Sequence, residues 1–264
     1  MTLSFRPHPS SAGRIRDTHL QGSRRFRHGT QPRSQLEDTL LLDPDNGMVV
    51  VADGIGGRPG GEIASSMAVQ AIQECLTNEE WGSAWGDRMA RAVFLANQQI
   101  WSAASEDPTR AGMGTTVTAL VLVAEPERWI IGNVGDSRGY LLRDGKLRRV
   151  TRDHTVVQDL VGSGALAPDA TGDHPLGHLI NRAVGTEGSV EADTFEGDAM
   201  SGDIFLLCTD GLVGLIMDDE LEGLLKGLTS DGLEDKALKL IEVAHTGGAP
   251  DNVTVGFLAL EEST

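Results

Sequence analysis

Acidic residues recur at the ends of apolar segments in this sequence, where they could bind metal ions. The segments MVVVADG, IIGNVGDSRG and FLLCTDG end on Asp53, Asp136 and Asp210, and Asp251 in APDNVTV precedes another apolar run. Side chains at strand ends lie at the rim of a sheet, so these acids could meet at one edge. Two carboxylates about 4 Å apart repel by roughly 4 kcal/mol at an effective dielectric of about 20, so a cluster requires a cation. Carboxylate oxygens favour hard divalent ions, Mg²⁺ or Mn²⁺.

Other interpretations of the same residues fit less well. An isolated Asp-Gly pair is usually a turn, but the pattern here recurs. Gly54, Gly56 and Gly60 follow a strand, yet their spacing is GxGxxxG and Asp53 would repel the pyrophosphate of a dinucleotide. The sequence contains no GK[ST] for a P-loop, and neither HExxH nor paired CxxC for zinc.

Size, charge and cysteine content restrict the class of protein. A chain of 264 residues and 28.1 kDa can form one large domain with a proper core. The net charge of −17 argues against a nucleic-acid partner. No apolar run approaches the roughly 18 residues that a membrane span needs. Cys75 and Cys208 lie far apart in apolar patterns, which predicts buried, reduced thiols in a cytoplasmic protein.

The N-terminal region has the opposite charge from the rest of the chain. Residues 1–35 contain seven arginines and one acid, which gives +6 there and −23 elsewhere. A transit peptide is the alternative, but Pro7 and Pro9 would interrupt its amphipathic helix. We expect a flexible basic segment over residues 1–28 and a single domain over residues 29–262.

The remaining sequence predicts grouped strands and grouped helices. The turn DPDNG predicts a hairpin between residues 39–42 and 48–52. The runs TTVTALVLV, RWIIGNV and RGYLLR predict an antiparallel meander. Asp144-Gly145 predicts a second hairpin, and residues 153–190 read as a loop-rich, mobile flap. Helical periodicity predicts helices at about 62–76, 88–101 and 233–245. This grouping favours an α+β fold.

Six segments in series resemble the metal-dependent protein phosphatases of type 2C, the PPM class. They are VADGIGGRPGGEIAS, GMGTTVTAL, NVGDSRGYLLRDGKL, TRDHT, LLCTDGL and GGAPDNVTV, within about Arg33 to Leu260. The resemblance implies an αββα four-layer sandwich, in which two antiparallel sheets are flanked by helices. It also implies hydrolysis of phosphoserine and phosphothreonine on proteins.

The resemblance further implies a role for individual residues in binding two core Mn²⁺ or Mg²⁺ ions. Asp53 would bridge the ions, and the Gly54 carbonyl would bind one of them. Asp210 and Asp251 would hold the other ion. Glu37 would act on the first ion through a water molecule.

Binding of a third ion and of the substrate is implied in the same way. Asp136, together with Asp210, would hold a weaker third ion, and Arg33 would bind the substrate phosphate. A water activated by the core ions would attack phosphorus, so no Ser or Cys nucleophile is required. This chain departs from some relatives at Ile55, where they carry a His, and at His178, where they carry a Ser near the third ion.

The resemblance implies phosphorylated proteins and a cognate Ser/Thr kinase as partners. We expect a cytoplasmic monomer that binds neither nucleic acid nor membrane. The alternatives are a catalytically silent scaffold and a dedicated regulator of one switch protein, such as an anti-sigma antagonist. His154 and His174 lie in loops and are predicted to be solvated, and Asp153 is predicted to order its loop.

Overall fold

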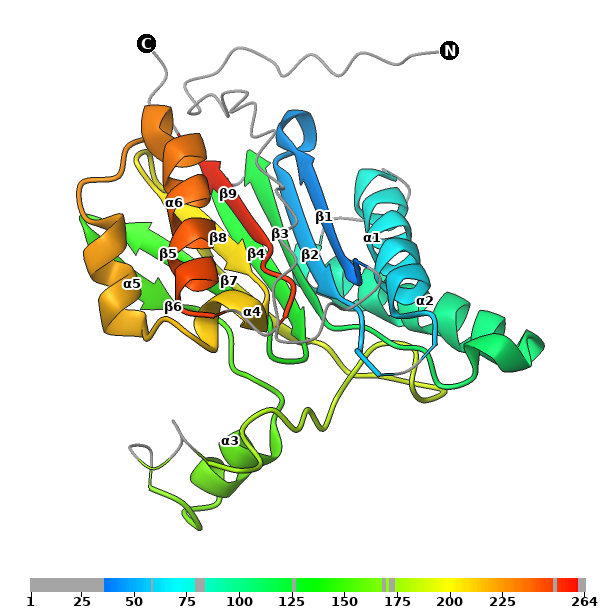
Figure 1. Ribbon diagram of the computed structural model, residues 1–264. Coiled ribbons are helices and arrows are strands. Elements are labelled where there is room, and N and C mark those ends of the chain that lie inside the picture. The colour runs from blue at the N-terminus through cyan, green and yellow to red at the C-terminus, as the bar shows by residue number, and fades with distance from the viewer. Residues whose placement is uncertain are drawn as a thin grey trace.

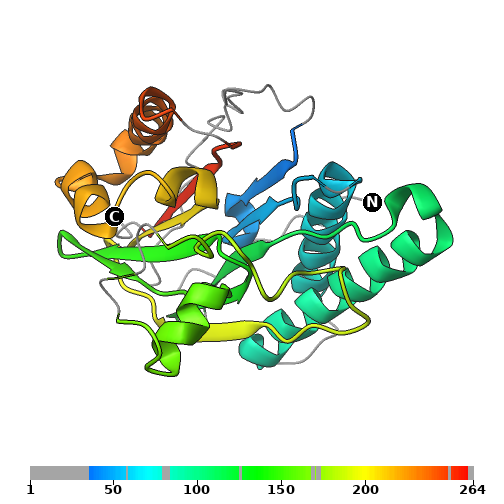
Figure 2. The ribbon, with the colours of Figure 1, turned by 60° about the horizontal axis from the view of Figure 1, so that its bottom comes forward.

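The protein is a sandwich of two antiparallel sheets covered on each outer side by helices. The computed structural model describes residues 36–57, 59–78, 84–124, 127–167, 170, 174–248 and 251–260. Figure 1 shows α1 (Gly61–Thr77) and α2 (Trp85–Glu106) against one sheet, and α5 (Asp218–Leu225) and α6 (Leu233–Thr246) against the other. Figure 2 shows the two helix pairs on opposite sides of the sheets. The predicted α+β fold of αββα type is confirmed.

The two sheets have different strand orders. The five-stranded sheet has the order β1-β2-β3-β4-β7, and the four-stranded sheet has the order β6-β5-β8-β9. The strands of the first sheet are β1 (Asp38–Asp43), β2 (Met48–Asp53), β3 (Val117–Ala124), β4 (Glu127–Val134) and β7 (Asp193–Asp198). Those of the second are β5 (Arg138–Arg143), β6 (Lys146–Arg149), β8 (Ile204–Cys208) and β9 (Val255–Ala259). Two shorter helices are α3 (Val156–Gly162) and α4 (Asp210–Val213).

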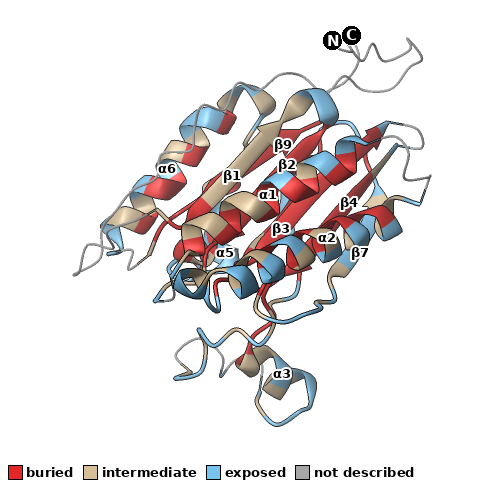
Figure 3. Ribbon diagram, turned by 90° about the vertical axis from the view of Figure 1, so that its right-hand side faces the viewer, coloured by how far each residue is buried: buried red, intermediate tan, exposed pale blue. Residues whose placement is uncertain are grey.

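Alternation along the strands fills three apolar layers. On β2, Met48 and Val50 pack against α1 and α2, whereas Val49 and Val51 point between the sheets. Phe205 and Leu207 of β8 meet them there, and a third layer lies between the second sheet and α4, α5 and α6. Successive side chains of a strand point to opposite faces, so one apolar run serves two cores. Figure 3 shows the resulting burial along the strands and the inner faces of the helices.

Most elements lie where the sequence predicts them. The DPDNG turn joins β1 to β2, and Asp144-Gly145 joins β5 to β6. The helices predicted at 62–76, 88–101 and 233–245 correspond to α1, α2 and α6, and α6 ends at Gly247. Cys75 and Cys208 are free and buried, as predicted. Within the described residues, no helix is both long and apolar enough to cross a bilayer.

The predicted meander is wrong at its third strand. β4 pairs with β3 and β7, but β5 pairs with β6 and β8 in the other sheet. The chain changes sheets at Gly135, which has φ of 102° and lies beside Thr116. A pattern of apolar strands records which residues are buried but not which sheet each strand joins.

The sequence pattern also missed β7, α4 and α5. β7 has the sequence DTFEGD and alternates half-buried and exposed residues at the edge of its sheet. Two aspartates, a glutamate and a glycine give it low strand propensity. α4 has only four residues, which is too short for helical periodicity to appear.

The chain between β6 and β7 extends away from the sandwich, and the two ends of this extension lie side by side. Thr155 and Ile180 form an isolated bridge, and the Val156 N–H donates to the Leu179 carbonyl at 2.9 Å. We call residues 156–179 the flap segment and the Thr155–Ile180 pair its neck. The first element of the flap segment is α3. Figure 1 shows it away from the sheets, at the end of the sandwich where α4 lies.

We expect Phe205→Ala to lower the free energy of unfolding by about 3–5 kcal/mol, because its ring is fully buried between the sheets beside Trp129. Urea unfolding measures this change. Phe94→Ala on α2 is the matched control, since that ring is 44% exposed and its loss should change stability by about 0.5 kcal/mol or less. Equal losses for the two variants would contradict the layered core described here.

Candidate metal centre

The acidic residues predicted from strand ends do lie at one edge of the sandwich. Asp53 is the last residue of β2, and Asp210 begins α4 directly after β8. Asp251 precedes β9, and β2 of the first sheet packs on β8 and β9 of the second. The acids therefore come from opposite sheets and meet across the layer between them.

Asp53 is at the centre of this group. Its side chain is buried, and its carboxyl group lies within hydrogen-bonding reach of the Asp210 carboxyl group. Burial raises the pKa of Asp53 well above its ordinary value, and the charges of Asp38, Asp210 and Asp251 raise it further. A carboxyl–carboxyl hydrogen bond requires that one partner be protonated. Without a proton or a cation, these groups repel each other.

Asp38, the first residue of β1, is another buried acid beside Asp53. Its Oδ2 accepts hydrogen bonds from the hydroxyls of Thr209 at 3.1 Å and Thr254 at 2.5 Å. Burial raises the pKa of Asp38 to about 6, although these hydrogen bonds lower it. The two threonine hydroxyls therefore fix the position of the Asp38 carboxylate beside Asp53.

The donor set suits a hard divalent cation. Within the described part of the chain, the buried Oδ1 atoms of Asp38 and Asp210 have no hydrogen-bond partner. Such atoms carry a large desolvation cost unless a cation or a proton satisfies them. Among the same residues, no three His, Cys, Asp or Glu side chains already surround one point at which an ion could sit.

Glu37 and Gly54 are brought together at the start of α1. The Gly54 N–H donates to the Glu37 carbonyl at 3.1 Å, and the Glu37 N–H donates to Asn252 Oδ1 at 3.0 Å. A Cβ on Gly54 would lie 2.3 Å from the Gly61 carbonyl oxygen, so only glycine fits there. Glu37 Oε1 lies just outside Gly61, where a Cβ would approach it to 3.1 Å. Glu37 is thus held close to the end of β2 that carries Asp53.

Gly211 makes an equally close approach on the other side. A Cβ on Gly211 would lie 2.0 Å from the Asn252 carbonyl oxygen. Asn252 follows Asp251, so this contact brings the segments that carry Asp210 and Asp251 together. The glycines after Asp53 and Asp210 therefore allow the backbones that carry the other acids to come near.

Comparison with known proteins identifies the family. Residues 32–240 match the family described as Protein phosphatase 2C. The chain is 38% identical over 238 residues to the serine/threonine phosphatase stp of Listeria welshimeri, which covers 88% of this chain and 90% of that protein. The chain belongs to the protein phosphatase 2C family. The predicted family and enzyme class, protein serine/threonine phosphatase, are confirmed.

Solved structures of related phosphatases share this fold. The crystal structure of Mycobacterium tuberculosis PstP/Ppp superposes with a TM-score of 0.80 and 35% identity, covering 91% of this chain and 97% of that one. The catalytic domain of PstP, in complex with two manganese ions, has a TM-score of 0.77 and 34% identity and covers 90% of this chain and 96% of that one.

Asp136 lies beside the central acids of the phosphatase, in the turn where the chain changes sheets. Burial raises its pKa to about 8, and the charges of Asp210 and Asp153 raise it further. Asp136 is thus close enough to Asp210 for their charges to interact, as the sequence predicted. Arg33, the predicted phosphate ligand, lies outside the described residues.

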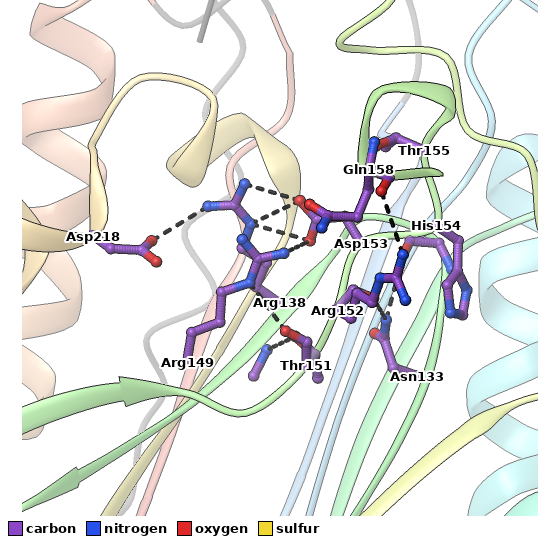
Figure 4. Close-up of polar contacts among 12 residues, drawn as sticks. Asn133, Arg138, Arg149, Thr151, Arg152, Asp153, His154, Thr155, Gln158 and Asp218 are labelled. Carbon is purple, nitrogen blue, oxygen red and sulfur yellow. Dashed lines mark hydrogen bonds and ion pairs between the residues drawn. The ribbon is translucent and has the colours of Figure 1, made fainter. Parts of the chain in front are cut away.

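Two residues of the TRDHT block differ in how well the sequence predicted them. Arg138 Nη2 forms an ion pair with the Asp153 carboxylate at 2.9 Å, and Arg149 forms a second one. Asp153 therefore orders its loop, as predicted. Figure 4 shows both arginines directed at Asp153. His154 was predicted to be solvated, but it is buried, with 6% of its surface exposed. The prediction failed because a lone histidine in a polar loop carries no periodic signal of burial.

We expect Gly211→Ala to destabilise the phosphatase by about 1–3 kcal/mol, because the new methyl group would overlap the Asn252 carbonyl. Urea unfolding and turnover should fall together as the segment that carries Asp251 is displaced. The control is Gly223→Ala in α5, where nothing lies within 4 Å of the new Cβ. This second change should stabilise the helix by roughly 0.5–1 kcal/mol. A neutral Gly211→Ala would contradict the close backbone contact.

In excess EDTA, the free energy of unfolding should fall as the pH rises from about 4 to about 8. Burial raises the pKa of Asp38 to about 6 and that of Asp136 to about 8, both above the ordinary 3.8. In that window the folded protein therefore binds more protons than the unfolded chain, and stability decreases with pH. Urea titrations across the window measure the slope. Asp136→Asn should flatten its upper half, and a stability that rises with pH would contradict this assignment.

Proposed function

We propose that this phosphatase hydrolyses phosphoserine and phosphothreonine on proteins at the edge of the sandwich where its buried acids converge. Two Mn²⁺ or Mg²⁺ ions, when bound there, supply a water of lowered pKa and neutralise the phosphoryl oxygens. The observation that supports this most directly is the cluster of Asp38, Asp53 and Asp210, of which the first two are buried and whose mutual repulsion a cation would relieve. The two manganese ions of the related PstP catalytic domain support the choice of ion.

The role proposed for each residue is the one that the family resemblance implies. Asp53 and the adjacent Gly54 carbonyl would hold one ion, and Asp53, Asp210 and Asp251 would hold the other. Glu37, whose backbone N–H donates to Asn252, would act through a water molecule. Burial raises the pKa of Asp53 well above its ordinary value, so a bound cation would favour its ionised form.

A weaker third site is proposed at Asp136 and Asp210. The electrostatic effect of Asp210 on Asp136 supports this pairing. His178, on the flap segment, stands where similar enzymes carry a Ser near that ion, so the surroundings of this site differ from theirs. Arg33 remains the proposed ligand of the substrate phosphate, a role that suits the planar guanidinium group.

The chain's own residues argue against a covalent route through cysteine. Cys208 is fully buried, and burial raises the pKa of its thiol to about 12, so it carries no thiolate at neutral pH. Cys75 is also buried, and burial raises its pKa as well. Ile55 offers no proton at the position where some relatives have a His, so solvent protonates the leaving alcohol.

The partners and the cellular location are proposed in the same terms. The substrates are phosphorylated proteins, and a Ser/Thr kinase that phosphorylates them is the proposed counterpart. The free, buried thiols of Cys75 and Cys208 support a reducing, cytoplasmic location. We propose that the chain acts as a monomer.

We expect the phosphatase to release phosphate from a phosphothreonine peptide in Mn²⁺ and to lose this activity in excess EDTA. Asp53→Asn and Asp251→Asn should each lower kcat by at least about 100-fold, because each removes a charge that holds the ions. Each variant should still unfold cooperatively in urea. Phosphate release with a malachite green assay measures the turnover.

The control is Asp231→Asn, an exposed acid away from the cluster, which should keep wild-type turnover. Full activity of the wild type in excess EDTA would refute the proposed chemistry. A folded wild type that binds Mn²⁺ but releases no phosphate from any phosphopeptide would instead favour a silent scaffold. Turnover of one phosphoprotein but of no peptide would favour a dedicated regulator.

A further inference from the structure

The buried side chain of His154 binds the turn that carries Asp136. The Gly135 N–H donates to His154 Nδ1 at 3.1 Å, and the His154 N–H donates to the Gly135 carbonyl at 2.9 Å. Both backbone polar groups of Gly135 are thus paired with one residue. Gly135 directly precedes Asp136 and has a φ of 102°, so the direction of the turn depends on how Gly135 is held.

These contacts determine which tautomer the imidazole ring adopts. Because Nδ1 accepts a hydrogen bond, the proton of the neutral ring is on Nε2. Nε2 lies 3.3 Å from Asp193 Oδ2 on β7, and Asp193 Oδ1 also binds Arg182 at 2.8 Å. Burial lowers the pKa of His154, which favours the neutral ring that the Gly135 contact requires. Nδ1 therefore accepts a hydrogen bond from Gly135, whereas Nε2 lies near Asp193 without a hydrogen bond to any of the described residues.

The backbone of His154 lies at the base of the flap segment. Its carbonyl accepts from the Asn181 N–H at 3.0 Å, and the next residue, Thr155, pairs with Ile180 in the neck. His154 is therefore bound on one side to the turn of Asp136 and on the other to the returning chain of the flap segment.

Neighbouring side chains hold the same base rigidly. Asn133 Nδ2 donates to the Arg152 carbonyl at 3.1 Å, and Arg138 binds both carboxylate oxygens of Asp153. Figure 4 shows these residues around His154, with Arg138 also directed at Asp218 at the start of α5. With its neighbours fixed in this way, the imidazole holds a constant position relative to both sheets.

We propose that His154 is a positioning residue that, through Nδ1, fixes the Gly135–Asp136 turn against the neck of the flap segment and so orients the Asp136 carboxylate toward Asp210. The proposal rests on the proposed function, which gives Asp136 its part in ion binding. His154 does not touch the reacting atoms. Its effect passes through the Gly135 amide alone.

Substitution of His154 by two different amide side chains tests the contacts of the two ring nitrogens separately. His154→Asn keeps an acceptor, Oδ1, at about the place of Nδ1. His154→Gln instead extends its amide toward the place of Nε2 and Asp193. If the Gly135 contact is the one that matters, the Asn variant should behave like wild type and the Gln variant should not. His174→Gln, a change at a partly exposed histidine of the flap segment, is the matched control.

The first measurement is hydrogen exchange of the Gly135 amide by NMR, in excess EDTA. His154→Gln should accelerate this exchange about tenfold or more, because a buried hydrogen bond is lost. His154→Asn and His174→Gln should leave it near the wild-type rate. Amides in the middle of β8 should not change in any variant. The second measurement is the Mn²⁺ concentration for half-maximal phosphopeptide hydrolysis, which should rise in His154→Gln and recover in His154→Asn.

Equal exchange rates at Gly135 in the Asn and Gln variants would overturn the proposal. So would faster exchange spread over both sheets, or a loss of cooperative unfolding in both variants, since either result assigns His154 a purely structural role. A wild type without Mn²⁺-dependent hydrolysis would refute the proposed function, whereas the exchange comparison in EDTA would still decide what His154 holds. Normal wild-type hydrolysis, combined with equal Gly135 exchange in the Asn and Gln variants, would refute only the role of His154 and not the proposed function.

Discussion

Repulsion among buried carboxylates is the constraint on which the rest of this structure depends. Asp38, Asp53 and Asp210 come from both sheets, and burial together with the charge of Asp210 raises the pKa of Asp38 and of Asp53. A hydrophobic core would exclude such a group, because burying unpaired charge costs more than most single contacts return. The acids are therefore kept at the rim of the sandwich, where ions and solvent can reach them, while the three apolar layers hold their backbones in place.

Close backbone contacts convert this arrangement into a defined site. Gly54 lies against Gly61 and Gly211 lies against Asn252, at distances that no side chain could share. The second contact joins the segments that carry Asp210 and Asp251, and Glu37 Oε1 lies beside Gly61 at the first. Much of the functional geometry thus depends on the main chain, and Asp38 is also held through its side chain by two threonine hydroxyls.

The sequence indicated the candidate residues of the site better than the tertiary contacts between them. Asp53, Asp210 and Asp251 stand out because each adjoins an apolar run, and Gly54 because an acid precedes it. The burial of His154 was not predicted, since its partners Gly135 and Asp193 are 19 and 39 positions away and leave no local pattern. For the same reason the sequence did not show that β5 belongs to the second sheet, because strand pairing is a non-local choice.

By itself, the sequence determined the alternation of apolar residues, the positions of the main helices and hairpins, and the types of atom available to bind a cation. These properties depend on neighbouring residues and so can be read along the chain. Only the tertiary structure decided that the chain changes sheets at Gly135, that Asp38 is enclosed by Thr209 and Thr254, and that His154 joins the turn of Asp136 to the neck of the flap segment. Those contacts join residues far apart in sequence, and only the packing of the two sheets brings them within bonding distance.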